Sequence, residues 1–528
     1  MALALAVAMV APATASAAPS PGGPGLGEPF EIYKWQGNGG YDVQNYDIDL
    51  TYQPSTDHLA GRAVITAQAT KELSEFNLDF WLKVSSVKVN GVEASYRTMT
   101  EDQTELVVTP KTPILGGTFQ VEVVYSGTPS EAGQGVERVR WSRSGPKDLS
   151  LPRTGGLSVN QPRTAEWWYP VNDHPSDKAT YSVSVNVPKD YVAISNGHYL
   201  STKDDGPGRV RWSWWSREPM APYLAYVAIE RFQYETGTAR ISGRDVPYFR
   251  AYDPNLESFG LMPTAKKVLE SSDQITDFLA SQFGPYPFDT TGGVASSGIP
   301  FAIENQSRST YGTIAMAAGD YGQDETWVTA HEQAHQWFGD SVSIGNWKQM
   351  WLNESFATYA EWLWSEHRGG PTADKLANAY YNRDWAAAPW SDPTFWNNSV
   401  ADPDGIFGYP VYYRGAMGLH ALRKKIGDAK FFLLLKRYHS EHKYQNAFTT
   451  DFTALAEEIG GPGVREVFDT WIYSETKPAT SPAGLAVTVD AKTVRQAAAM
   501  TRVHDALIAA GHGDHGHGAE APDAQAPK

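Results

Sequence analysis

The sequence predicts an α+β multidomain protein, in which an antiparallel, β-sandwich-like N-terminal domain is followed by a mainly helical domain. Apolar and polar residues alternate at many places between residues 41 and 240, and this period of two is typical of half-buried strands. Beyond about residue 253 the apolar residues recur with the spacing of helices. At 528 residues the chain is also longer than one hydrophobic core usually supports, so we expect two folded domains.

The first residues have features of an export signal. Residues 1–17 contain a short apolar run followed by Ala15-Ser16-Ala17, the small-x-small form of a signal-peptidase site. The usual basic start is missing, so either the true start lies upstream or the segment is only an Ala-rich tail. We favour a signal peptide, and therefore a secreted, extracellular protein in which the Pro- and Gly-rich residues 18–38 form a flexible leader.

The N-terminal β-domain is assigned to residues 39–248. Residues 46–52, 119–123 and 181–187 each alternate between apolar and polar side chains, as strands with one buried face do. Asn90-Gly91, set between two short valine-containing runs, is a two-residue hairpin signal.

The helical domain is assigned to residues 249–480. Residues 261–283 fit a helix that has Val268, Ile275 and Leu279 on one face. The Gly and Pro residues that follow end it.

The remaining residues, 481–528, are rich in Ala, Pro and Asp. We expect them to form a C-terminal tail that is largely disordered, with one weak helix around residues 494–508.

The composition argues against several classes of partner. The formal net charge is −16 and no cluster of Lys and Arg interrupts it, so nucleic acid is not an expected partner. The acidity instead fits cationic ligands such as a protonated amine. The absence of cysteine excludes disulfides and thiolate metal ligands. No later stretch is long and apolar enough to span a membrane. The oligomeric state is not predicted.

The candidate metal-binding motif is His331-Glu332-Gln333-Ala334-His335. No helix breaker occurs around it before Gly339, and two histidines four residues apart in a helix can ligate one metal from the same face. Glu332 is rotated by about 100° from His331 and can reach a water on the open side of the metal. The five-residue pattern alone is weak evidence, because two surface histidines would also produce it.

A third ligand strengthens the case. A catalytic zinc takes three protein ligands and leaves one position open. Glu354 stands nineteen residues after His335 in a second helical pattern, so His331, His335 and Glu354 would together hold one Zn²⁺ per chain. A third histidine is excluded locally, because Phe338 and Ser341 stand where that motif needs Gly and His.

With these and further motifs in the same order, the chain resembles the M1 family of zinc metallopeptidases, which includes aminopeptidase N and leukotriene A4 hydrolase. The resemblance covers about residues 40–480. The matching motifs are HExxH followed by Glu after 18 residues, at His331 to Glu354; G-A-M-E-N, at Phe301-Ala302-Ile303-Glu304-Asn305; Y-x-K-G, at Tyr412-Tyr413-Arg414-Gly415; F-P-C-x-D-E-P-x-x-K-A-T, at residues 168–180; and a substrate-binding Glu or Gln, at Gln161.

The resemblance implies a thermolysin-like catalytic domain, an active site between the two domains, and an aminopeptidase acting on peptides with a free N-terminus. Glu332 would take a proton from the attacking water and pass it to the leaving amine. Tyr412 would donate to the oxyanion. Glu304 would hold the protonated amine of the substrate, with Gln161 as a neutral second contact, and Ala302 would offer backbone groups.

Three departures from the family pattern matter. Phe301 replaces a glycine, so its backbone cannot adopt glycine-only angles. Thr358 stands where thermolysin-like enzymes carry an acid that orients a ligand histidine; Glu361 is our candidate for this role, unless it faces solvent. Too few residues follow Trp471 to form the large helical C-terminal domain of longer relatives, so we expect a more open active site.

Three alternative functions stay open. The first is an epoxide hydrolase of the leukotriene A4 hydrolase type, and the second is an endopeptidase. The third is a catalytically inactive homologue that only binds peptides, against which the intact motifs argue.

Overall fold

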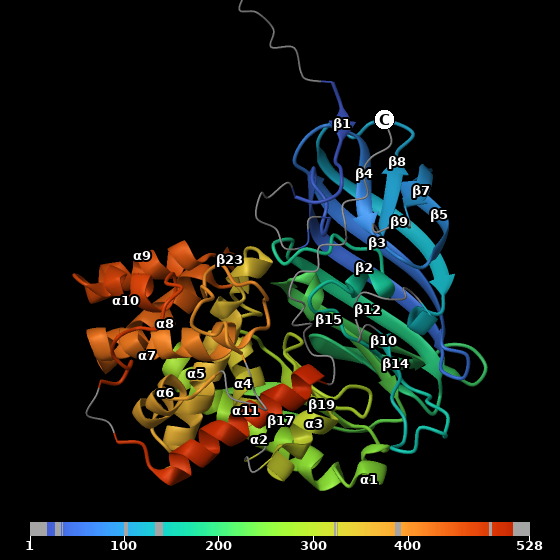
Figure 1. Ribbon diagram of the computed structural model, residues 1–528. Helices are drawn as coiled ribbons and strands as arrows, with labels where there is room; N and C mark the ends of the chain where they lie inside the picture. The colour runs from blue at the N-terminus through green and yellow to red at the C-terminus, as the bar shows by residue number, and fades with distance from the viewer. Residues whose placement is uncertain are drawn as a thin grey trace, which may run out of the picture.

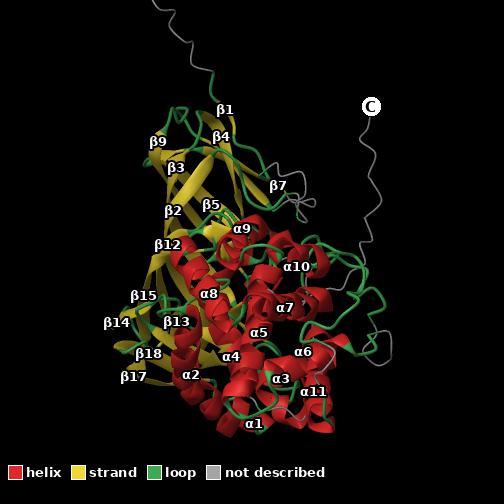
Figure 2. Ribbon diagram, turned by 90° about the vertical axis from the view of Figure 1, so that its left-hand side faces the viewer, coloured by secondary structure: helices red, strands yellow, loops and turns green. Residues whose placement is uncertain are grey.

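The computed structural model describes residues 18–26, 33, 35–99, 104–131, 141–321, 324, 326–385, 392–484 and 488–509 (Figure 1). A β-rich N-terminal half and a mainly helical C-terminal half lie side by side (Figures 1 and 2), which confirms the predicted fold class. None of the described helices combines the length and apolarity that a membrane span needs. The predicted signal peptide, residues 1–17, lies outside the described residues.

Three sheets form the N-terminal half. The largest has the strand order β14-β15-β12-β2-β3-β9-β5-β6 and is antiparallel except for the pair β2 and β12. The others have the orders β1-β4-β8-β7 and β10-β11-β16-β13. The strands are β1 (Ser20–Pro21), β2 (Tyr41–Gln53), β3 (His58–Ala69), β4 (Leu73–Asp79), β5 (Lys83–Val89), β6 (Val92–Glu93), β7 (Ser95–Met99), β8 (Glu105–Thr109), β9 (Gly117–Gly127), β10 (Trp141–Ser142), β11 (Gly156–Ser158), β12 (Ala179–Pro188), β13 (Val192–Ser195), β14 (His198–Asp204), β15 (Arg209–Met220) and β16 (Val227–Glu230).

Aromatic rings join these sheets into a sandwich-like stack. The ring of Phe76 on β4 lies 5.4 Å from that of Phe119 on β9, and the ring of Tyr52 on β2 lies 5.5 Å from that of Trp141 on β10. The predicted hairpin at Asn90-Gly91 is confirmed: both residues have positive φ, 50° and 76°, as a tight turn between β5 and β6 requires.

The domain boundary lies earlier than we predicted. β17 (Gln233–Ile241) and β18 (Arg244–Tyr252) belong to a five-stranded sheet of the helical half, with the order β17-β18-β19-β21-β20. A boundary between residues 248 and 249 would therefore cut β18 in two. Strands β17 and β18 alternate like the earlier strands, and periodicity does not show which sheet a strand joins. The partner strands are β19 (Thr291–Ala295), β20 (Ala302–Ile303) and β21 (Ser309–Tyr311).

Helices pack around this sheet and on one another. The predicted helix over 261–283 is α2, which ends where Gly284 donates to the carbonyl of Ala280. Strand β22 (Ser343–Ile344), after α4, pairs in parallel with β23 (Asn446–Ala447), after α8. The helices are α1 (Leu256–Phe259), α2 (Met262–Phe283), α3 (Thr313–Met316), α4 (Thr326–His335), α5 (Trp351–His367), α6 (Ala373–Tyr381), α7 (Gly415–Ile426), α8 (Asp428–His442), α9 (Thr449–Gly460), α10 (Val464–Trp471) and α11 (Ala491–Ala509).

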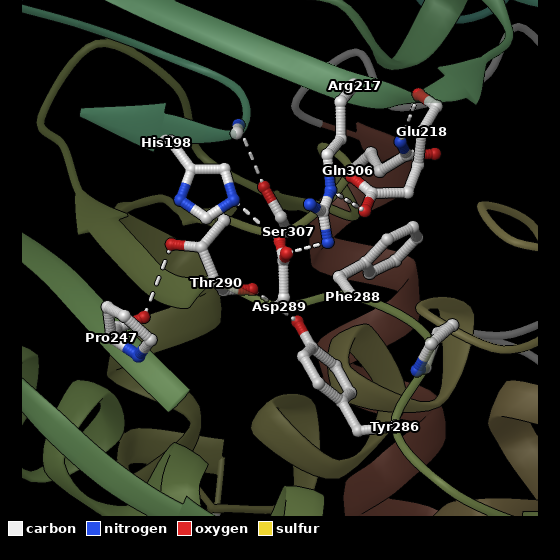
Figure 3. A network of polar contacts seen from close by, with 12 residues as sticks. His198, Arg217, Glu218, Pro247, Tyr286, Phe288, Asp289, Thr290, Gln306 and Ser307 are labelled. Atoms are coloured by element: carbon white, nitrogen blue, oxygen red, sulfur yellow. Dashed lines mark hydrogen bonds and ion pairs between the residues drawn. The ribbon is translucent and has the colours of Figure 1, made fainter. Parts of the chain in front are cut away.

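Polar contacts connect the two halves. In the cluster drawn in Figure 3, Nε2 of His198 on β14 lies 2.6 Å from Oδ1 of Asp289, and Arg217 of β15 pairs with the same carboxylate. The backbone N–H of the residue before His198 donates to Oγ of Ser307 over 3.0 Å. The N–H of Ser307 in turn donates to Oε1 of Gln336, 2.7 Å away, beyond the end of α4. The edge of the large sheet is thereby linked to the segments that carry two of the predicted site motifs.

The described part of the leader, residues 18–26, 33 and 35–38, is more ordered than predicted. Strand β1 pairs with β4, and the buried Asn38 donates to Oδ2 of Asp79 over 2.9 Å. Gln36 is also buried, and its Oε1 accepts from Nε1 of Trp347 in the helical half at 2.6 Å. Composition suggested flexibility because these long-range partners cannot be seen in a local stretch of sequence.

The described part of the tail contains the helix that we predicted there, and this helix is longer than expected. Residues 491–509 form α11, which includes the predicted weak helix, and α11 packs on α6 and α3. Packing of this kind stabilises a helix that its own propensity would leave weak. Residues 510–528 lie outside the described part of the chain.

Candidate active site

Two adjacent helices bring the predicted metal ligands together. His331 and His335 lie one turn apart on α4, and Glu354 lies in the first turn of α5, which packs against α4. Asp324 accepts a hydrogen bond from the N–H of Thr326 over 2.9 Å and so caps the start of α4.

The three ligand side chains converge on one point. Oε2 of Glu354 lies 3.1 Å from Nε2 of His331 and 3.4 Å from Nε2 of His335. One ligand atom from each residue lies within 4.8 Å of the others. Two imidazoles and one carboxylate are a donor set of catalytic zinc sites, so the residues present fit the metal.

Hydrogen bonds on the far side of each imidazole fix its direction. Nδ1 of His331 lies 2.5 Å from Oε1 of Glu361, and Nδ1 of His335 lies 3.1 Å from the carbonyl oxygen of Phe338. Both histidines therefore turn Nε2 toward the ligand cluster. Glu361 is only 2% exposed, so the predicted orienting contact is confirmed and a solvent-facing side chain is excluded.

The charges of the cluster stabilise one another. Burial opposes ionisation of Glu354, but the imidazoles of His335 and His331 hold the pKa of its carboxyl well below the ordinary value. Burial likewise opposes the charged form of His331, but the hydrogen bonds that its imidazole donates to Glu354 and Glu361 raise the pKa of that imidazole well above its ordinary value. The site is thus arranged to keep a carboxylate at its centre, as a cation requires.

Glu332 lies beside the ligands and in the same cavity. Burial raises the pKa of its carboxyl to about 8, while the imidazoles of His331 and His335 oppose the rise. Its Oε2 is buried and makes no hydrogen bond to any described residue. A pKa near neutrality suits a group that takes up a proton and releases it again.

The two predicted amine-binding residues meet across the domain boundary. Nε2 of Gln161, from the N-terminal half, donates to Oε1 of Glu304, which follows β20, over 2.9 Å. Glu304 is 3% exposed, and burial raises the pKa of its carboxyl. Nε2 of Gln336 donates to the backbone carbonyl of Glu304 at 3.4 Å. This pair of residues, Gln161 and Glu304, is called the amine clamp below.

The strand before the clamp supplies Ala302, which also lines the cavity. Phe301 stands where the resemblance expects glycine, and its φ is not positive. Its carbonyl accepts from the N–H of Gly312 over 2.7 Å. The backbone here therefore needs no glycine-only conformation, and the substitution leaves the strand intact.

Tyr412 faces the ligands from a π-helical turn, Pro410–Arg414, that precedes α7. Its ring lies 6.1 Å from that of His331, nearly parallel to it. Burial raises the pKa of the phenol well above its ordinary value, so the hydroxyl keeps its proton at neutral pH. The hydroxyl makes no hydrogen bond to a described residue. π-helical turns inside helices are frequent at functional sites.

Arg414 anchors this turn. Its guanidinium is fully buried and donates to the carbonyls of Trp471, Trp396 and Asn398 at 3.0 to 3.1 Å. The family motif has a lysine where this chain has Arg414. The five N–H groups of the arginine can donate to several carbonyls at once.

All the predicted site residues line one cavity of about 50 Å³. The sequence motifs included Thr358 and Tyr413 without a role in the cavity, and no motif marked three further lining residues: Trp327, Val328 and His504. His504 comes from α11 and lies in the wall of the cavity. The C-terminal helix therefore contributes to the wall of the cavity, where we expected a more open site.

The fold and this ligand set define a zinc metallopeptidase of two domains. Family profiles match in order: the peptidase M1 N-terminal domain over residues 43–224 and the peptidase family M1 domain over residues 268–471. The chain belongs to the M1 family of zinc metallopeptidases.

Solved and curated relatives agree with this assignment. The M1 zinc metallopeptidase of Deinococcus radiodurans superposes with a TM-score of 0.73 at 27% identity, over 87% of this chain and 99% of that one. The chain is 29% identical to glutamyl aminopeptidase of Bos taurus over 59% of its own length and 33% of that protein. It is 25% identical to aminopeptidase M1-D of Oryza sativa subsp. japonica over 79% and 48%. The chain thus spans less than half the length of these curated relatives.

Proposed function

We propose that the protein is an aminopeptidase that removes the first residue from peptides with a free N-terminus. The observation that carries the proposal is the amine clamp. Glu304 and Gln161 are in contact, and both line the cavity that holds the metal ligands. A buried carboxylate at this place binds an ammonium group and fixes the distance from the substrate amine to the reacting carbonyl.

Glu332 is the proton carrier of the reaction. A bound zinc ion would supply a Lewis acid that activates water and polarises the substrate carbonyl. The Glu332 carboxylate accepts a proton from the attacking water, and the protonated form then delivers this proton to the nitrogen of the leaving amine. The buried Oε2, without a hydrogen-bond partner among the described residues, leaves the carboxylate able to receive that proton.

Tyr412 stabilises the negative charge that forms on the substrate during the reaction. Its hydroxyl stays protonated at neutral pH and donates to the carbonyl oxygen as negative charge develops there. One donor of this kind contributes about 3 kcal/mol to the stabilisation of the transition state. Since the hydroxyl has no hydrogen-bond partner among the described residues, no existing contact has to break first.

The clamp explains why cleavage would be restricted to the N-terminus. Burial raises the pKa of Glu304, and an ammonium bound beside it restores the ionised form. Gln161 adds a dipole rather than a second charge, so the clamp carries at most one negative charge. A substrate with a blocked amine leaves that charge buried without a counter-charge.

The relatives support the same activity. Several are named as aminopeptidases, and the Deinococcus radiodurans enzyme has been solved with a Tyr-Ser-Ala substrate. Related two-domain structures hold L-arginine and L-tryptophan. These ligands all present a free α-amine, as the clamp requires.

The test compares kcat/KM for one peptide with a free and with an acetylated N-terminus, in wild type and in Glu304→Gln. The wild type should prefer the free amine strongly, and Glu304→Gln should lose most of that preference through a raised KM. Gln161→Ala is the matched control within the clamp and should cost less, about 0.5 to 1.5 kcal/mol, because its contact is neutral. Equal turnover of both peptides by the wild type would point to an endopeptidase instead.

A further inference from the structure

The C-terminal helix α11 is fixed to the catalytic half at several points along its length. Nζ of Lys375 pairs with the carboxylate of Asp490, next to the start of α11, at 2.9 Å. Nε2 of Gln496 donates to Oγ of Ser365 over 3.1 Å. Further along, Nη1 of Arg383 donates to Oγ1 of Thr501 at 2.9 Å.

The inward face of α11 is well packed. Ala497, Met500, Thr501 and Val503 are buried, with exposed fractions of 5% or less. A side chain in the last turns of such a helix is therefore held in a defined position relative to α5, α6 and the active site.

His504 follows directly on this packed face and reaches Tyr412. Its ring lies edge-on to the ring of Tyr412, with 4.4 Å between centroids and 73° between planes. It also contacts the rings of Tyr409 and Tyr413, at 5.2 and 5.7 Å. The ring of the ligand His331 is another neighbour of the Tyr412 ring, 6.1 Å away and nearly parallel to it. Tyr412 is thus held between a metal ligand and a residue of α11.

Tyr412 needs such a support. Its hydroxyl makes no hydrogen bond to a described residue, so its position depends on packing of the ring alone. A donor that stabilises a transition state has to be held within about 0.5 Å of its working position. Removal of one of the rings that confine it would let the phenol sample other positions, at a cost to the rate rather than to binding.

We propose that His504 is a positioning residue, which holds the Tyr412 hydroxyl in place for catalysis, and that α11 is therefore part of the active site. This inference rests on the proposed function, in which Tyr412 donates to the developing oxyanion. Helix α11 lies outside residues 268–471, the part that the family profile matches, so the family pattern assigns it no role.

The test is a double-mutant cycle on the full-length zinc enzyme. kcat and KM for an amino-acyl anilide are measured for wild type, His504→Ala, Tyr412→Phe and the double variant, with zinc content and thermal unfolding recorded for each. His504→Ala should lower kcat about tenfold with KM little changed, which is about 1.4 kcal/mol. In the Tyr412→Phe background the same change should have little further effect, because the hydroxyl that it positions is gone.

Two further variants separate the ring contact from other effects. His504→Phe keeps an aromatic ring and should retain most of kcat. His504→Gln keeps comparable volume without a ring, and it replaces His504→Ala in the cycle if that protein does not fold. Gln496→Ala is the matched control: it removes one hydrogen bond of α11, about two helical turns before His504. It should leave kcat within about twofold of wild type.

An equal loss of kcat in both backgrounds, or full activity of His504→Ala or His504→Gln, overturns the positioning role. Full activity of Tyr412→Phe has a different meaning, since it removes the oxyanion role from the proposed function itself. A slow Tyr412→Phe enzyme beside a fully active His504→Ala enzyme contradicts only the inference on α11.

Discussion

At the scale of single residues, two buried carboxyls of the site have pKa values that are shifted in opposite directions. Glu354 carries a lowered pKa and stays ionised, whereas Glu332, one position from His331, has a pKa raised to about 8. Both carboxyls are buried, so the difference comes from their contacts: Glu354 hydrogen-bonds both imidazoles, while Oε2 of Glu332 makes no hydrogen bond to a described residue. Two buried carboxyls with different pKa values can take different roles in one reaction.

Substitution of these two residues should therefore give distinct losses. Glu354→Ala should abolish zinc retention and activity together, because only the two imidazoles remain as ligands. Glu332→Gln should keep about one zinc per chain and lose several orders of magnitude in kcat, since an amide cannot accept the proton of the attacking water. Metal analysis of each purified protein, with kcat measured on the same sample, checks both. Stoichiometric zinc in Glu354→Ala would mean that another residue is the third ligand.

The ligands and the base could be predicted because helix geometry relates residues that are close in sequence. His331, Glu332 and His335 lie within one turn and a half of α4, so their relative directions follow from the sequence alone. Glu361 could be proposed in the same way, from its place on the helix of Glu354. His504 could not, because only tertiary packing brings it to Tyr412.

At the scale of elements, the segment that follows the zinc-binding helix α4 makes a contact with α8. Ser341 lies in this segment, and its Oγ is 3.1 Å from Nε2 of His439 on α8. His439 is 3% exposed, and burial, assisted by the charge of Lys443, lowers the pKa of its imidazole to about 3. Helix α8 therefore contacts the segment after the zinc-binding helix through a neutral imidazole.

This buried imidazole should make the fold sensitive to acid. Between pH 6.5 and about 3 the unfolded chain binds a proton at His439 and the folded protein does not, so the free energy of unfolding falls as the pH falls. At pH 5 the loss from this group amounts to about 2 kcal/mol relative to neutral pH. Denaturant unfolding of wild type and His439→Gln at pH 7 and pH 5 measures it, because the difference between the proteins cancels the other titrating groups.

A histidine on the surface provides the comparison. His58 is exposed, so His58→Gln should leave the change between pH 7 and pH 5 as it is in wild type. A pH dependence in His439→Gln that equals that of wild type would show that His439 is protonated in the folded protein.

Element types were easier to predict than element partners. Helix α2 was predicted to within one residue at its start, since its apolar face repeats over many turns. Strand β17 and the first part of β18 fell within the range that we assigned to the N-terminal β-domain, because β19, the strand that links them to the sheet of the helical half, comes later in the chain. Helix α11 was predicted as a weak element, and its stability comes from contacts with α6 and α3 that the sequence does not display.

At the scale of the whole molecule, the relative position of the two domains is part of the active site. The amine clamp takes Gln161 from one domain and Glu304 from the other, so movement between the domains changes its geometry. The interface is held by polar groups such as His198 with Asp289 as well as by packing (Figure 3).

That the protein is exported stays a prediction from residues 1–17. N-terminal sequencing of the mature protein, which we expect to begin at residue 18, checks this prediction.

Lys178, just before β12, offers a way to loosen this interface. Its Nζ donates to the backbone carbonyls of Asp340 and Ser341, directly after the zinc-binding helix, over 2.9 and 3.0 Å. Lys178→Met removes both donors and leaves two carbonyls without them, which should lower the free energy of unfolding by about 1 to 3 kcal/mol. Lys189→Met is the matched control: its ion pair with Asp204 is exposed, so the change should cost less than about 1 kcal/mol.

The same variant should change catalysis in a particular way. The Lys178 contacts join the two domains that supply Gln161 and Glu304, so their loss should raise KM for peptides with a free amine by more than it lowers kcat. The ligands, Glu332 and Tyr412 all lie within the helical half and keep their geometry. Urea unfolding and steady-state kinetics of Lys178→Met and Lys189→Met measure the two effects. A destabilised Lys178→Met protein with an unchanged KM would show that the clamp is held by each domain separately, and that the interface serves stability alone.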